Sequence, residues 1–148
     1  MAFKSEVTIK APIEDIFDIF SNYKYFSDAL NHIMKVEKET EGPVGVGTVF
    51  VERRHIRNMS IDNKLVVTEY VENEKFAIES KQNKLILNYY YSFTQGEEGT
   101  KVSFIGKVRT KGIKNFMYKP LIEKIIKRED GDHLEKMKQY IEENVVKG

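Results

Sequence analysis

Residues 52–57, with the sequence ERRHIR, bring acid, base and imidazole side chains together in one short stretch. The flanking pattern predicts a strand, and a strand directs successive side chains to opposite faces. One face then carries Glu52 and Arg54. The other face carries the basic side chains Arg53, His55 and Arg57. The chemistry available therefore depends on which of the two sets faces the interior.

Two interpretations of this strand stay open. Phe50 and Ile56 are in phase with the first set, which would turn that set inward. An inward Arg54 would be able to anchor a carboxylate, sulfate or enolate oxygen of a ligand. The catalytic residues are unknown at this stage, and the weak candidates are Glu52, Arg54 and His55. The simpler interpretation, favoured on these residues alone, is that the hairpin extends beyond its covering helix and is solvated on both faces.

Other catalytic or metal-binding patterns are missing from the sequence. The histidines His32, His55 and His133 lack metal-ligand spacing, and each is expected to be a surface or hydrogen-bonded residue. The chain has no cysteine, which excludes thiolate chemistry and disulfides. No serine lies in a G-x-S-x-G turn. We therefore expect no metal site and no cofactor.

The glycine-rich stretch GPVGVGT, residues 42–48, raises the question of a phosphate-binding loop. Such a loop leads from a strand into a helix, whose N–H groups then face the phosphate. Here the next residues, 49–56, have the pattern of a strand, and Thr48 stands where a P-loop needs lysine. We interpret the stretch as a turn in which glycines take positive φ before a strand.

The N-terminal third contains a predicted strand and two predicted helices. Residues 3–10 alternate as a half-buried strand, and residues 12–20 have the apolar spacing of an amphipathic helix. Residues 22–30 have the pattern of a second short helix, with Ser21 or Asn22 as its N-cap.

Six further strands and one long helix are predicted after them. Turn residues separate the strands, which lie at about 32–39, 48–56, 61–70, 75–80, 84–94 and 100–109. Short turns favour an antiparallel meander. The tail from about 114 to 146 has the three-and-four spacing of one long helix. One face of a seven-stranded antiparallel sheet must be covered by other elements. The long helix and the two short helices are available to cover it.

Composition limits the classes of function. The 148 residues fit one domain over 1–148. The net charge of +1, from 24 basic and 23 acidic residues, argues against a nucleic-acid binder. The charged start MAFKSEVTIK lacks the apolar run of a signal peptide, and no stretch approaches the roughly 20 apolar residues of a membrane span. We expect a cytoplasmic protein without a membrane span.

Aromatic and aliphatic side chains share one face of residues 85–93. That face carries Leu85, Leu87, Tyr89, Tyr91 and Phe93. Apolar residues of the neighbouring strands and of the helices are expected to pack against it. Taken alone, such a stripe is typical of a core. Buried tyrosine hydroxyls need hydrogen-bond partners, which a ligand or water would supply.

Several segments resemble one known superfamily. VTIKAPIEDIFDIFSN resembles the opening strand and helix of the START-like superfamily, also called Bet v 1-like or SRPBCC. TEGPVGVGTVF is similar to the glycine-rich turn of its polyketide cyclase/dehydrase and lipid-transport-like branch. VVTEYVENEKFAIES, YSFTQGEEGTKVSF and LEKMKQYIEENV follow in the superfamily's order, so the resemblance covers nearly the whole chain.

The resemblance implies an α+β helix-grip fold. In it, a seven-stranded curved antiparallel sheet wraps around a long C-terminal helix, with two short helices between strands 1 and 2. It also implies a deep, mostly apolar ligand cavity between sheet and helix. The residues expected to line this cavity are Phe17, Phe20, Phe50, Arg54, Phe76, Ile78, Leu87, Tyr89, Tyr91, Phe93, Phe104, Met117, Leu121 and Ile125.

Three functions are compatible with the resemblance. The first is binding of a small hydrophobic ligand, which would be a lipid, a polyketide-like molecule or an aromatic, by a carrier or sensor. The second is a cyclase or dehydratase that acts on a polyketide-like substrate, although no convincing catalytic set supports it. The third is a protein-interaction domain with an unknown protein partner. Fold membership does not select among the three.

Overall fold

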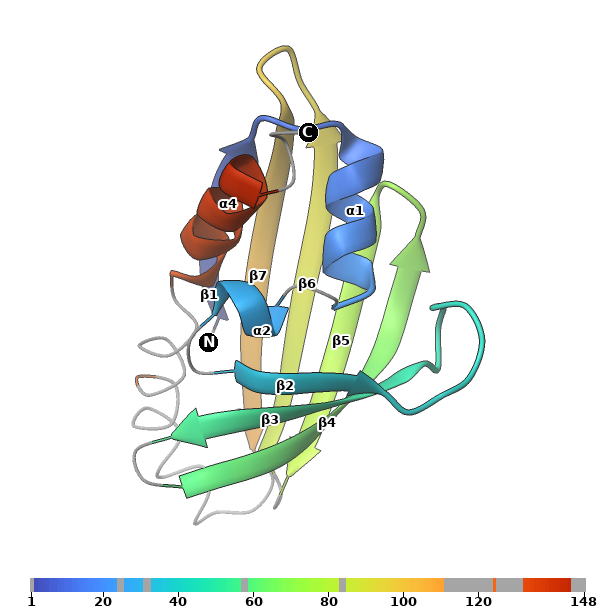
Figure 1. The fold of residues 1–148 in the computed structure, drawn as a ribbon. Helices are drawn as coiled ribbons and strands as arrows, with labels where there is room; N and C mark the ends of the chain where they lie inside the picture. Colours follow the sequence, from blue (N-terminus) through green and yellow to red (C-terminus); the bar gives the residue numbers. More distant parts are fainter. Residues whose placement is uncertain are drawn as a thin grey trace.

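The chain forms seven strands and, in the described part, three helices (Figure 1). The structure is a computed structural model that describes residues 2–23, 26–30, 33–56, 59–82, 85–110, 124 and 132–144. The helices are α1 (Ile13–Ser21), α2 (Phe26–Ala29) and α4 (His133–Asn144). The strands are β1 (Ala2–Ile9), β2 (Ile33–Lys38), β3 (Val49–Ile56), β4 (Met59–Val71), β5 (Lys75–Gln82), β6 (Leu85–Gln95) and β7 (Thr100–Thr110).

All seven strands belong to one antiparallel sheet with the order β1-β7-β6-β5-β4-β3-β2. Strands β2 to β7 therefore form a meander, and β1 pairs with β7 at the edge of the sheet. The sheet twists so strongly that β2 and β3 run nearly crosswise to β6 in the view of Figure 1. The helices lie on its concave face. This architecture confirms the predicted helix-grip fold.

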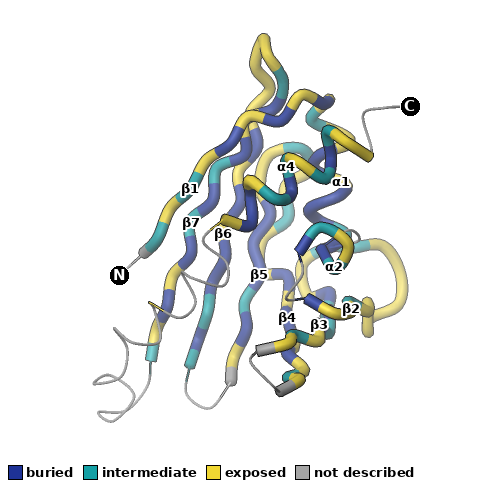
Figure 2. Tube along the Cα trace, turned by 60° about the vertical axis from the view of Figure 1, so that its left-hand side comes forward, coloured by how far each residue is buried: buried dark blue, intermediate teal, exposed yellow. Residues whose placement is uncertain are grey.

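The core lies between the concave face and the helices. Along β7, and along β6 from Tyr89 onward, the buried side chains alternate with exposed or half-buried ones, which gives the banded tubes of Figure 2. At Gly106 a Cβ atom would come within 2.5 Å of the Phe3 ring. The missing side chain therefore lets Phe3 of β1 lie directly over β7.

Helix α1 ends where the second helix was expected to begin. Ser21 is its last residue, and the Asn22 side chain donates to the Asp18 carbonyl at 2.8 Å. The prediction that Ser21 or Asn22 caps the second helix is therefore wrong. Tyr23 follows with φ of 56°, in the left-handed region, and this residue turns the chain toward the four residues of α2.

Helix α4 packs an apolar stripe onto the sheet beside β1. Its buried side chains are His133, Leu134, Met137 and Ile141. Lys138 Nζ donates to the Thr8 carbonyl at 2.7 Å, and the Lys10 N–H donates to Glu142 Oε2 at 2.9 Å. The predicted helix over 114–146 is matched over 133–144, and most of its first half lies outside the described residues. No helix in the described ranges is long and apolar enough to cross a membrane.

The glycine-rich stretch before β3 is a turn. Gly42 and Gly47 have φ of 90° and 94°, and the chain enters β3 at Val49. A residue with a Cβ atom is strained at such angles, which explains glycine at both positions. The prediction of a turn rather than a phosphate loop is confirmed.

Candidate functional site

Strand β3 turns its acidic residue inward. Phe50 and Glu52 are fully buried, and the Arg54 side chain on the same face is only 14% exposed. Arg53 and His55 are exposed on the opposite face. The interpretation that both faces are solvated is therefore wrong. Because Phe50 packs under the helices, the residues in phase with it follow it into the interior.

The two faces of β3 hold contrasting ion pairs. On the inner face, Arg54 Nε donates to Glu52 Oε1 at 2.5 Å. On the outer face, Arg53 Nε donates to Asp62 Oδ1 at 2.8 Å, and both side chains are about half exposed. The hydrogen bond from Arg53 and its charge lower the pKa of the Asp62 carboxyl. Only the inner pair is shielded from water.

The inner pair continues into a polar network across three strands. Glu52 lies opposite Asn63 on β4, and Asn63 Nδ2 donates to Glu52 Oε1 at 3.3 Å. Ser80 on β5 donates its hydroxyl hydrogen to Asn63 Oδ1. Asn63 and Ser80 are both buried. Glu52 Oε2 is buried without a hydrogen-bond partner among the described residues.

Asn63 and Ser80 were not among the sequence candidates. The signal that would have found them is their position in the strand pattern. Asn63 lies on the same strand face as Leu65 and Val67, and Ser80 lies on the same face as Phe76 and Ile78. A polar residue in phase with an apolar stripe is either an edge residue or a buried polar group. The antiparallel register, which places them next to Glu52, was not visible in the sequence.

A small cavity opens beside this network. Among the described residues, it is lined by Tyr23, Arg54, Asn63, Leu65, Ile78, Ser80, Leu87 and Tyr89. Its volume is about 10 Å³, room for about one water molecule. The Tyr23 ring stacks on Phe26 with a centroid separation of 4.0 Å, which holds it over this space. Of the expected cavity residues, Arg54, Ile78, Leu87 and Tyr89 line it.

The remaining aromatic candidates pack against one another at the other end of the core. Phe17 and Phe20 of α1 meet Phe93 at centroid distances of 5.2 and 5.7 Å. Tyr91 meets Phe104 at 5.1 Å. Phe76 joins this cluster through Tyr91, and Phe50 lies instead beside Tyr23. The expected lining residues Met117, Leu121 and Ile125 lie outside the described residues.

His133 is buried inside this aromatic cluster. Its side chain is almost fully covered, its Nε2 lies 3.0 Å from the Tyr91 hydroxyl, and its ring lies 4.5 Å from that of Phe104. His133 was expected to be either a surface residue or a hydrogen-bonded one, and it is the second. His32 lies outside the described residues, and His55 is exposed. His133 and the Glu52 network therefore occupy separate parts of the interior.

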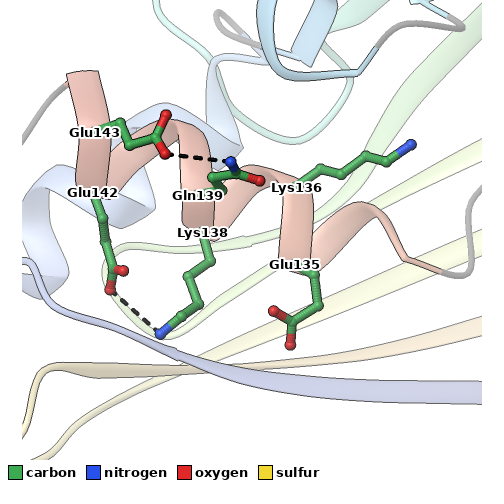
Figure 3. A pocket seen from close by; sticks show the side chains of 6 residues that line it. All are labelled: Glu135, Lys136, Lys138, Gln139, Glu142 and Glu143. Atoms are coloured by element: carbon green, nitrogen blue, oxygen red, sulfur yellow. Dashed lines mark hydrogen bonds and ion pairs between the residues drawn. The ribbon is translucent and has the colours of Figure 1, made fainter.

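Much larger hollows lie on the outside of the molecule, two of them of similar size. One, of about 320 Å³, is lined by charged and amide side chains of α4 among the described residues (Figure 3). The other, of about 340 Å³, lies on the convex face of the sheet beside Tyr90 and Lys107. Neither reaches the buried polar network. In the described part of the chain, no three histidine, aspartate or glutamate side chains gather as a metal site.

The chemistry of the inner site follows from its groups. Glu52 offers a carboxylate that is shielded from water, and Arg54 offers a charge held in place by that carboxylate. Asn63 and Ser80 add neutral hydrogen-bonding atoms beside an otherwise apolar wall. Such an arrangement can orient one polar group of an apolar molecule.

Comparison with known proteins gives the family. The family model for polyketide cyclase / dehydrase and lipid transport matches residues 1–142. No curated protein matches this chain at a significant level. Among solved structures, a START superfamily protein from Mycobacterium smegmatis has a TM-score of 0.71 at 18% identity, covering 98% of this chain and 97% of that one.

Two further structures share the fold. Ara h 8.0201 has a TM-score of 0.71 at 16% identity, covering 97% of this chain and 99% of that one. The di-domain ARO/CYC StfQ from the steffimycin biosynthetic pathway has a TM-score of 0.76 at 12% identity, covering 98% of this chain and 52% of that one. Because the family model matches nearly the whole chain, this protein belongs to the polyketide cyclase / dehydrase and lipid transport family.

Proposed function

We propose that this domain binds a small, largely apolar ligand between the inner face of the sheet and the helices, as a carrier or sensor. The observation that carries the proposal is the cavity lined by Arg54, Asn63 and Ser80 within an apolar core. Burying such groups opposes folding unless each is paired. These groups are paired with one another in the network, and a ligand that contacts them would add to this pairing. Membership of the family supports the same function.

Binding requires the walls of the cavity to move, because about one water molecule fits in it now. Tyr23 covers the cavity from the corner between α1 and α2. Its left-handed backbone conformation costs about 1–3 kcal/mol for a residue other than glycine. A shift of this corner that relaxes Tyr23 would offset part of the cost of opening.

The first test is native mass spectrometry of gently purified protein, followed by solvent extraction of anything bound. We expect a stoichiometric apolar adduct, and we expect apolar ligands to raise the melting temperature. Leu87→Trp should reduce that shift by filling the cavity. Val66→Trp, on the outer face of β4, is the matched control and should not. A clean apo mass, with no shift across a broad panel of lipids and aromatics, would overturn the proposal.

A second candidate is a cyclase- or dehydratase-type reaction on a polyketide-like substrate. The observation that favours it is Glu52 Oε2, which is buried without a partner among the described residues. A desolvated carboxylate of this kind suits a general base. Under this candidate, Glu52→Gln abolishes formation of an aromatic product from a poly-β-ketone thioester, followed by absorbance, but retains the melting shift given by neutral ligands. Undiminished turnover in Glu52→Gln would remove Glu52 from the mechanism.

A further inference from the structure

We propose that the cavity selects neutral ligands that carry a hydrogen-bond donor, such as a hydroxyl group, and discriminates against carboxylates. This inference rests on the proposed function, since it assumes that the cavity takes a ligand. It follows from the direction of the hydrogen bonds in the network and from the balance of its two charges.

The direction of the network begins at Glu52. An ionised carboxylate accepts hydrogen bonds and donates none. Arg54 Nε and Asn63 Nδ2 both donate to its Oε1, at 2.5 and 3.3 Å. Asn63 must therefore turn its amino group toward Glu52, which leaves its carbonyl oxygen Oδ1 facing Ser80. The orientation of this amide is fixed by the charge beside it.

The direction of the Ser80 hydroxyl follows from that of Asn63. A carbonyl oxygen only accepts, so Ser80 donates its single hydrogen to Asn63 Oδ1. Its Oγ then has only lone pairs left, and Ser80 is one of the residues that line the cavity. A polar ligand atom that meets this oxygen must bring its own hydrogen. A hydroxyl or N–H group satisfies it, whereas an ether or carboxylate oxygen does not.

The charges of the network lead to the same selectivity. Among the described residues that line the cavity, Arg54 is the cationic one, and its Nε–H donates to Glu52 Oε1. Their opposite charges compensate each other within the core. A ligand carboxylate would lose its hydration there and would lie near the carboxylate of Glu52. The role of Arg54 as an anchor for an anionic ligand is therefore disfavoured while Glu52 remains in place.

Three probes with one apolar body test this selectivity. The full chain is titrated with 2-naphthol, 2-methoxynaphthalene and 2-naphthoate, with heat release and melting temperature as readouts. We expect 2-naphthol to bind at least tenfold more tightly than the other two. If burial of apolar surface alone decided affinity, 2-methoxynaphthalene would bind more tightly than 2-naphthol, because the methoxy compound is the more apolar.

Two variants assign the selectivity to its residues. Ser80→Ala should remove the preference for 2-naphthol over 2-methoxynaphthalene. Glu52→Gln should raise the affinity for 2-naphthoate at least tenfold, because the charge of Arg54 is then no longer compensated by that carboxylate. Glu79→Gln is the matched control. It removes the same charge from the outer face, where Glu79 accepts from Asn88 at 2.9 Å, and should leave the order of the probes unchanged.

The outcomes separate this inference from the function on which it rests. Equal binding of the three probes by the wild-type chain, or an unchanged probe order in Ser80→Ala, overturns the selectivity and leaves ligand binding standing. Binding of none of the probes, together with a clean apo mass, overturns ligand binding itself. If Glu52→Gln does not fold, as judged by circular dichroism, Ser80→Ala decides the matter, since its smaller side chain leaves both charges in place.

Discussion

The two ends of the interior differ in composition: one is packed with aromatic rings, and the other contains a buried polar network. Near α1 and α4 the space is filled by rings, with Phe104 touching His133, Tyr89 and Tyr91. Under Tyr23, across β3 to β5, it holds a charged pair, an amide, a hydroxyl and a small cavity. Ring packing stabilises a fold without any ligand, whereas a buried polar network with a cavity does so poorly. The first end is therefore a structural core, and the second is the end at which the proposed ligand would gain most.

The largest expected effect is at the aromatic end. Phe104→Ala should lower the free energy of unfolding by about 3–5 kcal/mol, because it empties a buried site ringed by four aromatic side chains. Denaturant unfolding followed by circular dichroism measures this. Tyr90→Ala, on the half-exposed outer face, is the control and should cost far less. A loss below about 1 kcal/mol at Phe104 would mean that this end is not the structural core.

The next effect is at the polar end. Arg54→Met should lower the free energy of unfolding by about 3 kcal/mol, because it leaves the Glu52 carboxylate buried without its cation. Arg53→Met removes a similar pair one residue away on the solvated face and should cost much less. Equal losses in the two variants, measured by denaturant titration, would show that water reaches the inner pair.

A smaller effect separates the tyrosines that connect the two ends. Tyr91→Phe should lower the free energy of unfolding by about 1–2 kcal/mol, because it removes the hydroxyl that lies 3.0 Å from His133 Nε2. Its effect on binding of 2-naphthol should be slight. Tyr89→Phe alters the cavity wall and should change binding more than Tyr91→Phe does. The reverse pattern, in matched titrations, would place the ligand at the aromatic end.

The smallest effect concerns the attachment of α4 to β1. The hydrogen bond from the Lys10 N–H, assisted by Lys138, lowers the pKa of Glu142 from its ordinary value of 4.5. A carboxyl with a lower pKa in the folded state stabilises the fold above its unfolded pKa, and this contribution is lost as the pH falls through the folded pKa. The stability of the Glu142→Gln variant should therefore fall less steeply than that of the wild-type protein as the pH drops below about 4.5. An unchanged acid transition in thermal melts would contradict this role.

The sequence predicted the order of elements well because the relevant signals are local. Alternation along residues 3–10 and 85–93 is a property of each strand alone, and the turn at Gly42 and Gly47 needs only positive φ. The predicted cap of the second helix at Ser21 or Asn22 was wrong, because α1 extends to Ser21 and Tyr23 takes a left-handed conformation for which the sequence carries no signal. Asn63 and Ser80, whose roles depend on partners in other strands, were missed.

By itself, the sequence determined which residues share a face. Side chains two apart in a strand must lie together, so the spacing of Glu52 and Arg54 is enough to place them side by side. Only the tertiary structure decided that their face is the inner one and that β4 and β5 bring Asn63 and Ser80 beside them. The reason is physical: a period of two defines two faces, but the packing of helices over one of them decides which face loses water.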